Sequence, residues 1–455
     1  MERFFKKRRF GKTSLNISRI IALVFFIIIL LGTALLTLPF ASRSGESCGV
    51  LTAAFTATSA TCVTGLIMAD TWLQWSAFGQ IVIITLIEIG GLGFMSAASF
   101  VIFVFRRRVT MNARAAIAVS VGSDDMNDVV RIQKKMLLYG VGVQVFGALV
   151  LTLRFMEDFK FSKALRLGFF HAISAFCNAG FDILGFIKPG ASVAPYGTDT
   201  VVVLVLSFLI VFGGLGFLVW DEIIHLKSPK KWSVYTKLVM ITTAVLLAGG
   251  AVAFCAAEWN NPATLGAMNF FDKIKAGFFQ SATVRTAGFA GIDQGSLTDA
   301  GKALSIFLML IGGSSGSTAG GLKTVTFIVL VLFLWSRLRG KEHIHVFYRR
   351  IPEEHVLNAL TVFGFMVFLS FFGGTFLSAT SGVSFTDALY ESVSAIATVG
   401  LTTGITPTLS VSSKLLMMLY MYFGRVGILT VSLGFLQSEK SKGNFRYADT
   451  GLLIG

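Results

Sequence analysis

A pattern that occurs four times along the 455 residues restricts the possible folds of this chain more than any other property. Each copy consists of an apolar span, a shorter half-apolar segment, a turn of small residues that ends in glycine, and a second apolar span. The turns read SATCVTGL, SAFCNAGF, SATVRTAGF and SAIATVGL, and their glycines recur every 108 to 115 residues, at Gly65, Gly180, Gly288 and Gly400. Matched copies at a regular spacing indicate an internal repeat. We therefore expect four units of one architecture joined in a single chain.

Composition places these units in a lipid bilayer. Hydrophobic residues make up 54% of the chain and charged residues only 14%, and the mean hydropathy is +0.75. Runs long enough to cross a bilayer are expected at residues 18–38, 76–105, 136–156, 199–224, 238–257, 303–335, 356–379 and 413–436. The segments too short to cross are predicted to be re-entrant helices: Val50–Thr61, Leu165–Phe176, Phe271–Thr283 and Phe385–Ala397. The predicted fold is an all-α polytopic membrane protein, in which four covalently linked M1–pore-helix–M2 repeats surround one pore with pseudo-fourfold symmetry.

The charge distribution predicts the orientation of the chain. A net charge of +15 would suit a nucleic-acid partner, but the basic residues cluster in the short segments between spans. Such clusters mark the cytoplasmic side of a membrane protein, so we expect cytoplasmic termini and no nucleic-acid binding. The expected divisions are a cytoplasmic N-terminus (1–17), repeat 1 (18–105), a linker (106–135), repeat 2 (136–224), a linker (225–237), repeat 3 (238–336), a linker (337–355), repeat 4 (356–436) and a C-terminal tail (437–455).

One span is interrupted by a polar stretch that cannot remain helical. Residues Ile311–Thr324 read IGGSSGSTAGGLKT, and each glycine costs about 1 kcal/mol relative to alanine inside a helix. Irregular backbone at membrane depth occurs only where protein buries it or where it lines a water-filled cavity. We expect an intramembrane loop over residues 312–321; the alternative is a kinked helix that allows close packing. The stretch also resembles a phosphate-binding loop, but Leu322 separates Gly321 from Lys323 and breaks that motif.

The four turns have the chemistry of a filter for a monovalent cation. A re-entrant helix that ends inside the membrane directs the negative end of its dipole at the pore axis, and backbone carbonyls of the turn can replace an ion's hydration shell. The turns contain no carboxylate, which a divalent ion usually needs. The expected filter residues are Thr61, Cys62, Val63, Thr64 and Gly65; Cys177, Asn178, Ala179 and Gly180; Arg285, Thr286, Ala287 and Gly288; and Ala397, Thr398, Val399 and Gly400.

The four turns, together with GGSSGSTAGG, resemble the superfamily of potassium transporters that includes the Ktr, Trk and plant HKT proteins. Within it, the chain is most similar to KtrB-type membrane subunits of bacterial Ktr potassium-uptake systems. The resemblance implies K⁺ as the substrate, because glycine at all four filter positions goes with potassium selectivity in this family, and Na⁺ as a candidate co-ion. It also implies a homodimer and a separate cytoplasmic KtrA-like ring that binds ATP or ADP, with no cofactor in this chain.

Three charged residues inside the membrane require an explanation. Arg425 lies within the last span, where a charge is costly and marks a functional site; the alternative is that its side chain extends to the interface. Arg285 is expected to turn away from the pore axis and donate to loop carbonyls from behind, or else to be an exposed charge at the outer mouth. Glu88 has no partner that the sequence identifies.

The resemblance assigns a gate to the interrupted span. It implies that this loop lies beneath the filter and that Arg425 faces it. The expected gate residues are Gly312, Gly313, Ser314, Ser315, Gly316, Ser317, Thr318, Ala319, Gly320, Gly321, Lys323 and Arg425.

Three other functions remain as alternatives. A Trk/HKT-like transporter of K⁺ or Na⁺ would work without a Ktr-type regulator. A solute transporter of another class would use the interrupted span as its substrate site, but it predicts inverted or twofold repeats. A membrane enzyme would need clustered histidines and carboxylates near one membrane face, which the five histidines do not form with carboxylates inside the bundle.

Overall fold

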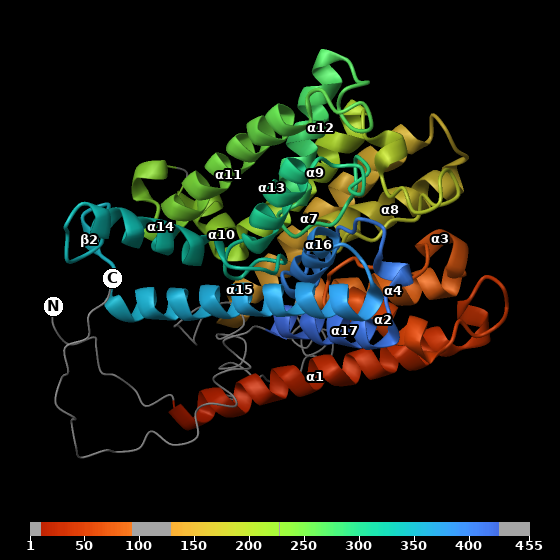
Figure 1. Ribbon diagram of the computed structural model, residues 1–455, viewed down its shortest axis with the longest axis horizontal. Helices are drawn as coiled ribbons and strands as arrows, with labels where there is room; N and C mark the ends of the chain where they lie inside the picture. Colours follow the sequence, from red (N-terminus) through yellow and green to blue (C-terminus); the bar gives the residue numbers. More distant parts are fainter. Residues whose placement is uncertain (1–10, 93–128, 227, 427–455) are drawn as a thin grey trace.

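The computed structural model describes residues 11–92, 129–226 and 228–426, which form an elongated bundle of helices (Figure 1). Residues 1–10 of the expected N-terminal segment, most of the expected first linker, and the expected C-terminal tail lie outside the described residues. The distal parts of the expected spans 76–105 and 413–436 also lie outside them.

Three sets of helices follow the repeated pattern of the sequence. The first long helix of each unit is α1 (Gly11–Thr37), α7 (Val129–Phe155), α11 (Val234–Glu258) or α15 (Glu353–Ser381). The short helices are α2 (Val50–Thr61), α8 (Phe161–Cys177), α12 (Phe270–Thr283) and α16 (Phe385–Ile396). The second helices are α4 (Ala77–Gly91), α9 (Thr200–Leu215) with α10 (Phe217–Leu226), α13 (Asp299–Leu310) with α14 (Thr324–Leu338), and α17 (Val411–Val426).

Small elements connect these helices. They are α3 (Thr71–Gln74), four 3₁₀ turns at Pro39–Ala41, Ala194–Tyr196, Pro229–Lys231 and Thr406–Thr408, and an antiparallel hairpin of β1 (His345–Val346) and β2 (Arg349–Arg350). The hairpin and α3 lie at opposite ends of the bundle (Figure 1).

The bundle is that of a multi-pass membrane protein. Among the described residues, three helices are each long and apolar enough to cross a bilayer, and a fourth crossing results if α9 and the bent α10 count as one span. The outward faces of the long helices are apolar, with large exposed side chains such as Leu30, Leu153, Val252 and Phe368. A water-soluble protein rarely exposes such continuous apolar surface, whereas lipid covers it without cost.

Two of the second helices are interrupted, although the sequence predicted only one interruption. The expected break between α13 and α14 is present, since residues 311–323 are not helical. The span expected to be continuous over 199–224 also breaks, at Gly216, where α9 and α10 differ in direction by 96°. Gly216 has φ +84°, and the next amide, Phe217 N–H, donates to the carbonyl of Gly316 at 3.1 Å. The loop of repeat 3 therefore takes the place that a straight α9 would have occupied.

Packing between the units forms a closed cycle. Each first helix packs extensively against the short helix that follows it, as α1 does with α2 and α7 with α8. Each short helix also packs against the second helix of the preceding unit: α8 against α4, α12 against α9, α16 against α13, and α2 against α17. The last contact joins the fourth unit to the first, so the four short helices are surrounded by the longer ones.

Candidate functional site

The four turns that follow the short helices meet at one place. A methyl group placed on Gly65 would lie 3.1 Å from the Cα of Gly180, and one on Gly180 would lie 2.8 Å from the Cα of Gly288. A methyl group on Gly288 would lie 3.2 Å from the Cα of Gly400, and one on Gly400 would lie 2.9 Å from the Cα of Gly65. The glycines that the sequence aligned therefore form a closed ring of contacts.

The same unusual backbone conformation occurs in each turn. Two residues have positive φ in every copy: the glycine itself, and the residue two positions before it. In three copies that earlier residue is the β-branched Val63, Thr286 or Thr398, for which positive φ is a genuine outlier. Such strain costs about 1–3 kcal/mol per residue and persists only where the surroundings enforce it. The pairs are Val63 (56°) with Gly65 (101°), Asn178 (58°) with Gly180 (67°), Thr286 (66°) with Gly288 (82°), and Thr398 (50°) with Gly400 (95°).

A buried hydroxyl supports each turn from behind, which the sequence analysis did not foresee. The hydroxyls of Ser59 and Ser394 each accept a hydrogen bond at 3.0 Å from the N–H of the turn glycine six residues later. The hydroxyls of Ser174 and Thr283 donate at 2.7 and 2.8 Å to the carbonyl of the phenylalanine that follows the turn glycine. The sequence does contain a pattern that could have predicted these contacts, because a serine or threonine stands five or six positions before each turn glycine.

Oxygen atoms converge on the ring of glycines. The carbonyl oxygen of the residue before each glycine packs against the glycine of a neighbouring turn; these residues are Thr64, Ala179, Ala287 and Val399. Four threonine side chains of the turns have buried hydroxyl oxygens without a hydrogen-bond partner among the described residues: Thr61, Thr64, Thr286 and Thr398. Buried polar atoms are nearly always paired. Oxygens that lack a protein donor can instead face a cation.

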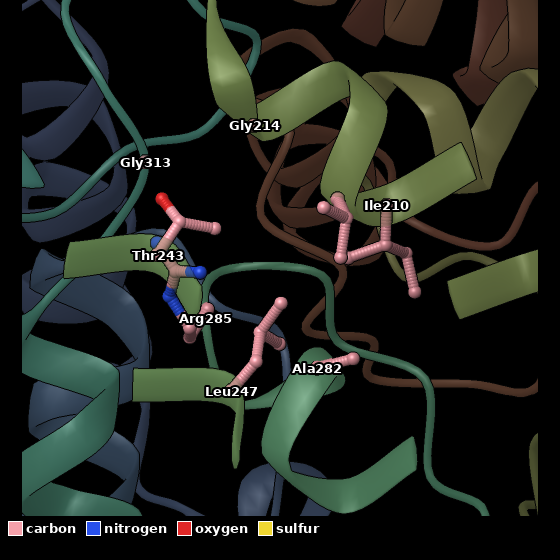
Figure 2. Close-up of a pocket in the computed structure, with 8 residues that line it drawn as sticks. Ile210, Gly214, Thr243, Leu247, Ala282, Arg285 and Gly313 are labelled. Carbon is pink, nitrogen blue, oxygen red and sulfur yellow. The ribbon is translucent and has the colours of Figure 1, made fainter. Parts of the chain in front are cut away.

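The structure buries every residue that the sequence assigned to the filter. Arg285 is also buried, with only 7% of its surface exposed, and it does not lie at an outer mouth. Its guanidinium donates to the carbonyl of Gly312 at 3.2 Å. Figure 2 shows the side chain beside Thr243, in a small pocket between α9, α11 and α12 that Gly313 also lines. Arg285 therefore connects the third turn to the loop of the interrupted span.

Backbone hydrogen bonds within the loop and to α9 pair many of its N–H and C=O groups. Its two ends run side by side, with Gly312 N–H donating to the carbonyl of Leu322 and Leu322 N–H donating to that of Leu310, both at 2.9 Å. Its middle is anchored on the end of α9, where Ser314 N–H donates to the carbonyl of Gly214 at 2.9 Å. Paired backbone of this kind can exist inside a bilayer because protein, and not lipid, surrounds it.

The loop also touches two of the four turns. The Thr318 hydroxyl donates at 3.0 Å to the carbonyl of Phe176, directly before the second turn. Gly320 packs against Thr398 of the fourth turn, where a methyl group on the glycine would lie 2.9 Å from the carbonyl of Ala397. Within the loop, the Lys323 ammonium donates to the carbonyl of Ala319 at 2.8 Å. The residues expected in the filter and in the gate are thus in direct contact.

Arg425 connects this loop to a third segment of the chain. Its guanidinium donates to the carbonyls of Thr318 in the loop and of Gly90 at the end of α4, and to that of Gly91 at 3.1 Å. The family resemblance implied the loop as its partner, but neither the resemblance nor the sequence indicated α4. Tyr235 of α11 was also missed; its hydroxyl donates to the carbonyl of Ser315 at 3.0 Å.

Glu88 has partners that lie far from it in sequence. Its carboxylate accepts from the amide of Gln144 on α7 at 3.1 and 3.2 Å, and from the thiol of Cys177 at 3.3 Å. Cys177 is the first of the residues that the sequence assigned to the filter in the second turn, and a methyl group on Gly91 would clash with it. Because both partners belong to another repeat, no local pattern could identify them.

Comparison with known proteins assigns the chain to a family. The family model for TrkH, described as a cation transport protein, matches residues 7–447. The chain belongs to this family of membrane cation transporters, and its relatives are transporters, not enzymes.

Individual relatives cover almost the whole chain. The potassium/sodium uptake protein NtpJ of Enterococcus hirae is 40% identical over 96% of this chain and 97% of that protein. The Ktr system potassium uptake protein B of Bacillus subtilis is 36% identical over 96% of both chains. Among solved structures, the potassium transporter TrkH from Vibrio parahaemolyticus shares the fold, with a TM-score of 0.71 at 18% identity, over 91% of this chain and 83% of that one.

Proposed function

We propose that this chain is the pore-forming subunit of a potassium-uptake system. Four M1–pore-helix–M2 repeats, with the boundaries given above, surround a single pore with pseudo-fourfold symmetry. The closed cycle of packing between α2, α8, α12, α16 and the second helices supports this arrangement. Relatives that match the chain over nearly their whole length are named as potassium uptake proteins, which supports K⁺ as the transported ion.

The observation that carries the proposal is the ring of four glycine turns with its buried oxygens. Thr64, Ala179, Ala287 and Val399 would supply carbonyl ligands to K⁺, and the unpartnered threonine hydroxyls would add further oxygens. The C-terminal ends of the four short helices meet here and add partial negative charge. Because no carboxylate belongs to the four turns, the site favours a weakly hydrated monovalent ion over a divalent one.

Transport then follows a simple path. K⁺ enters from the outside, loses its water at the ring of turns, passes the loop at residues 312–321, and leaves on the cytoplasmic side. The loop acts as the gate, with Lys323 and Arg425 holding it closed against the filter. Contacts of Thr318 and Gly320 with two of the turns support this role.

The regulation belongs to the same proposal. The subunit forms a homodimer and binds a separate cytoplasmic KtrA-like ring, which carries ATP or ADP, while its own termini are cytoplasmic. Relatives named as parts of a Ktr system support such a partner, and the potassium/sodium name of another relative supports a role for Na⁺. The second candidate is a Trk/HKT-like transporter that works without this regulator.

Uptake measurements in cells that lack their own potassium transporters test the proposal. We expect cells that express the chain with a KtrA-type subunit to accumulate Rb⁺ or K⁺ from micromolar to millimolar solutions, and Na⁺ to stimulate this uptake. Full uptake without the second subunit would favour the Trk/HKT-like candidate. Absence of alkali-cation uptake from a chain that reaches the membrane would contradict both.

A further inference from the structure

Three cationic side chains gather around one tryptophan at the end of the molecule where α3 lies (Figure 1). The guanidinium groups of Arg43 and Arg166 lie 4.6 and 4.8 Å from the ring centre of Trp72, and the ammonium of Lys163 lies 5.5 Å from it. These four residues, which we call the Trp72 cluster, come from three segments: the loop after α1, the single turn of α3, and the first turns of α8.

Aromatic rings hold the cluster in place. Lys163 lies 3.3 Å from the ring centre of Phe186 and 4.5 Å from that of Phe159, and the rings of Trp72 and Phe186 are 4.9 Å apart. Cation–π contacts of this kind contribute about 0.5–1 kcal/mol each at exposed sites. They fix the positions of the cations but leave their charge uncompensated.

No carboxylate neutralises the cluster among the described residues, where none of its three cations forms an ion pair. Arg166 donates to the amide oxygen of Gln80 at 2.6 Å, which is a neutral partner. Asp70 lies two residues before Trp72, but its carboxylate accepts from the N–H groups of Trp72, Leu73 and Gly190.

Two other cations among the described residues form ion pairs with carboxylates. Arg154 forms ion pairs with Asp158 and Asp199 at 3.0 and 2.6 Å, and Lys302 forms one with Asp387 at 2.8 Å. Since three neighbouring positive charges repel one another, the Trp72 cluster lacks an anion that these other sites have. Guanidinium groups match the geometry of phosphate oxygens particularly well.

The surroundings indicate where such an anion would come from. Large apolar side chains that lie within three residues of the cluster in the sequence are exposed: Leu73 by 48%, Phe161 by 61% and Phe40 by 58%. Tryptophan together with cations and exposed apolar side chains is typical of the membrane–water interface. At that depth the abundant anion is the phosphate of a lipid headgroup.

We propose that the Trp72 cluster binds the phosphate of an anionic phospholipid in the outer leaflet. Arg43 and Arg166 contact the phosphate oxygens, Lys163 adds a third positive charge, and Leu73 and Phe161 lie against the acyl chains. The choice of leaflet rests on the proposed topology, but the site itself does not depend on which ion the pore transports.

Lipid binding to the full-length protein tests the proposal. The purified protein is given phosphatidylglycerol, phosphatidylcholine or inorganic phosphate, and the midpoint of thermal unfolding and the lipid retained in native mass spectrometry are measured. We expect phosphatidylglycerol to raise the midpoint and to be retained in preference to phosphatidylcholine. In the double variant Arg43→Gln/Arg166→Gln, most of both effects should disappear.

Two further variants keep the test decisive. Lys273 stacks on Trp259 at 4.7 Å and donates to its carbonyl at 2.9 Å, so Lys273→Gln removes a cation that stacks on a tryptophan outside the cluster and should keep the lipid preference. Arg166→Lys retains the positive charge and should keep part of the preference for phosphatidylglycerol. This variant keeps the test informative even if the double variant folds poorly. Equal lipid preference in wild type and in both cluster variants would overturn the proposal. Stabilisation by inorganic phosphate with no preference for phosphatidylglycerol would also overturn it, because the ligand would then be a soluble anion.

Discussion

At the scale of single residues, the four turn glycines are needed for contact as well as for conformation. Each has positive φ, which glycine adopts without strain. Each also lies so close to a neighbouring turn that a side chain in place of the glycine would displace that turn. A methyl group on Gly65, for example, would lie 2.5 Å from the carbonyl oxygen of Ala179. A substitution at one turn should therefore move the carbonyl group of the neighbouring turn, which we propose as an ion ligand.

Gly65→Ser should weaken the preference for K⁺ and admit Na⁺ more easily. Forcing a side chain into this backbone conformation costs about 1–3 kcal/mol, and each 1.4 kcal/mol corresponds to about tenfold in binding. We expect the K⁺/Na⁺ uptake ratio to fall by about fivefold or more in uptake competition measurements. Gly364→Ala is the control, because no atom lies near its added methyl group. An unchanged K⁺/Na⁺ uptake ratio in Gly65→Ser would show that Gly65 does not belong to the filter.

Arg425→Gln should raise the K⁺ flux. The guanidinium donates hydrogen bonds to the carbonyls of Thr318, Gly90 and Gly91 and so links the loop to α4. Hydrogen bonds to a charged group contribute about 1.5–3 kcal/mol each. Without them the loop leaves its place under the filter more often. Initial rates of Rb⁺ uptake, normalised to protein in the membrane, measure the effect. A flux that is unchanged or lower in a folded Arg425→Gln protein would mean that Arg425 does not hold a gate.

At the scale of elements, the proposed gate lies where two membrane spans are interrupted. The loop between α13 and α14 lies against α9, whose own break at Gly216 makes room for it, and Tyr235 of α11 donates to its Ser315 carbonyl. Several of the hydrogen bonds that hold the loop come from side chains, and these can be removed by single substitutions.

Tyr235→Phe should favour the open position of the loop without changing ion preference. The lost hydrogen bond contributes about 1 kcal/mol, so we expect about a fivefold shift in the gating equilibrium and a higher K⁺ flux, at the same K⁺/Na⁺ ratio. Deletion of residues 312–321 should raise the flux further. Tyr139→Phe, whose hydroxyl has no hydrogen bond among the described residues, is the control. A Tyr235→Phe protein that matches wild type would indicate that this contact does not restrain the loop.

Some features of the helices could be predicted from the sequence, and others could not. The apolar spans, the short helices and the break before Gly312 were predictable, because length, composition and glycine content act locally. The break at Gly216 was not, since its cause is a loop about 100 residues away in the sequence. The partners of Glu88 were hidden for the same reason, because Gln144 and Cys177 lie in a different repeat.

At the scale of the whole molecule, the proposed fourfold arrangement around one pore depends on a closed cycle of helix contacts. The second helix of each unit packs on the short helix of the next, and α17 closes the cycle by packing on α2. This closure brings the four glycine turns together, so a fault in any unit should disturb the proposed ion site, to which all four turns contribute. The sequence predicted the convergence from the equivalence of the turns, but not the contacts that enforce it.

Anomalous X-ray scattering from crystals grown with Rb⁺ in place of K⁺ tests the central claim most directly. The account predicts a strong Rb⁺ peak inside the ring of Gly65, Gly180, Gly288 and Gly400, within ligand distance of the carbonyl oxygens of the turns. A ring without a peak, with Rb⁺ bound elsewhere, such as beside Glu88, would contradict it.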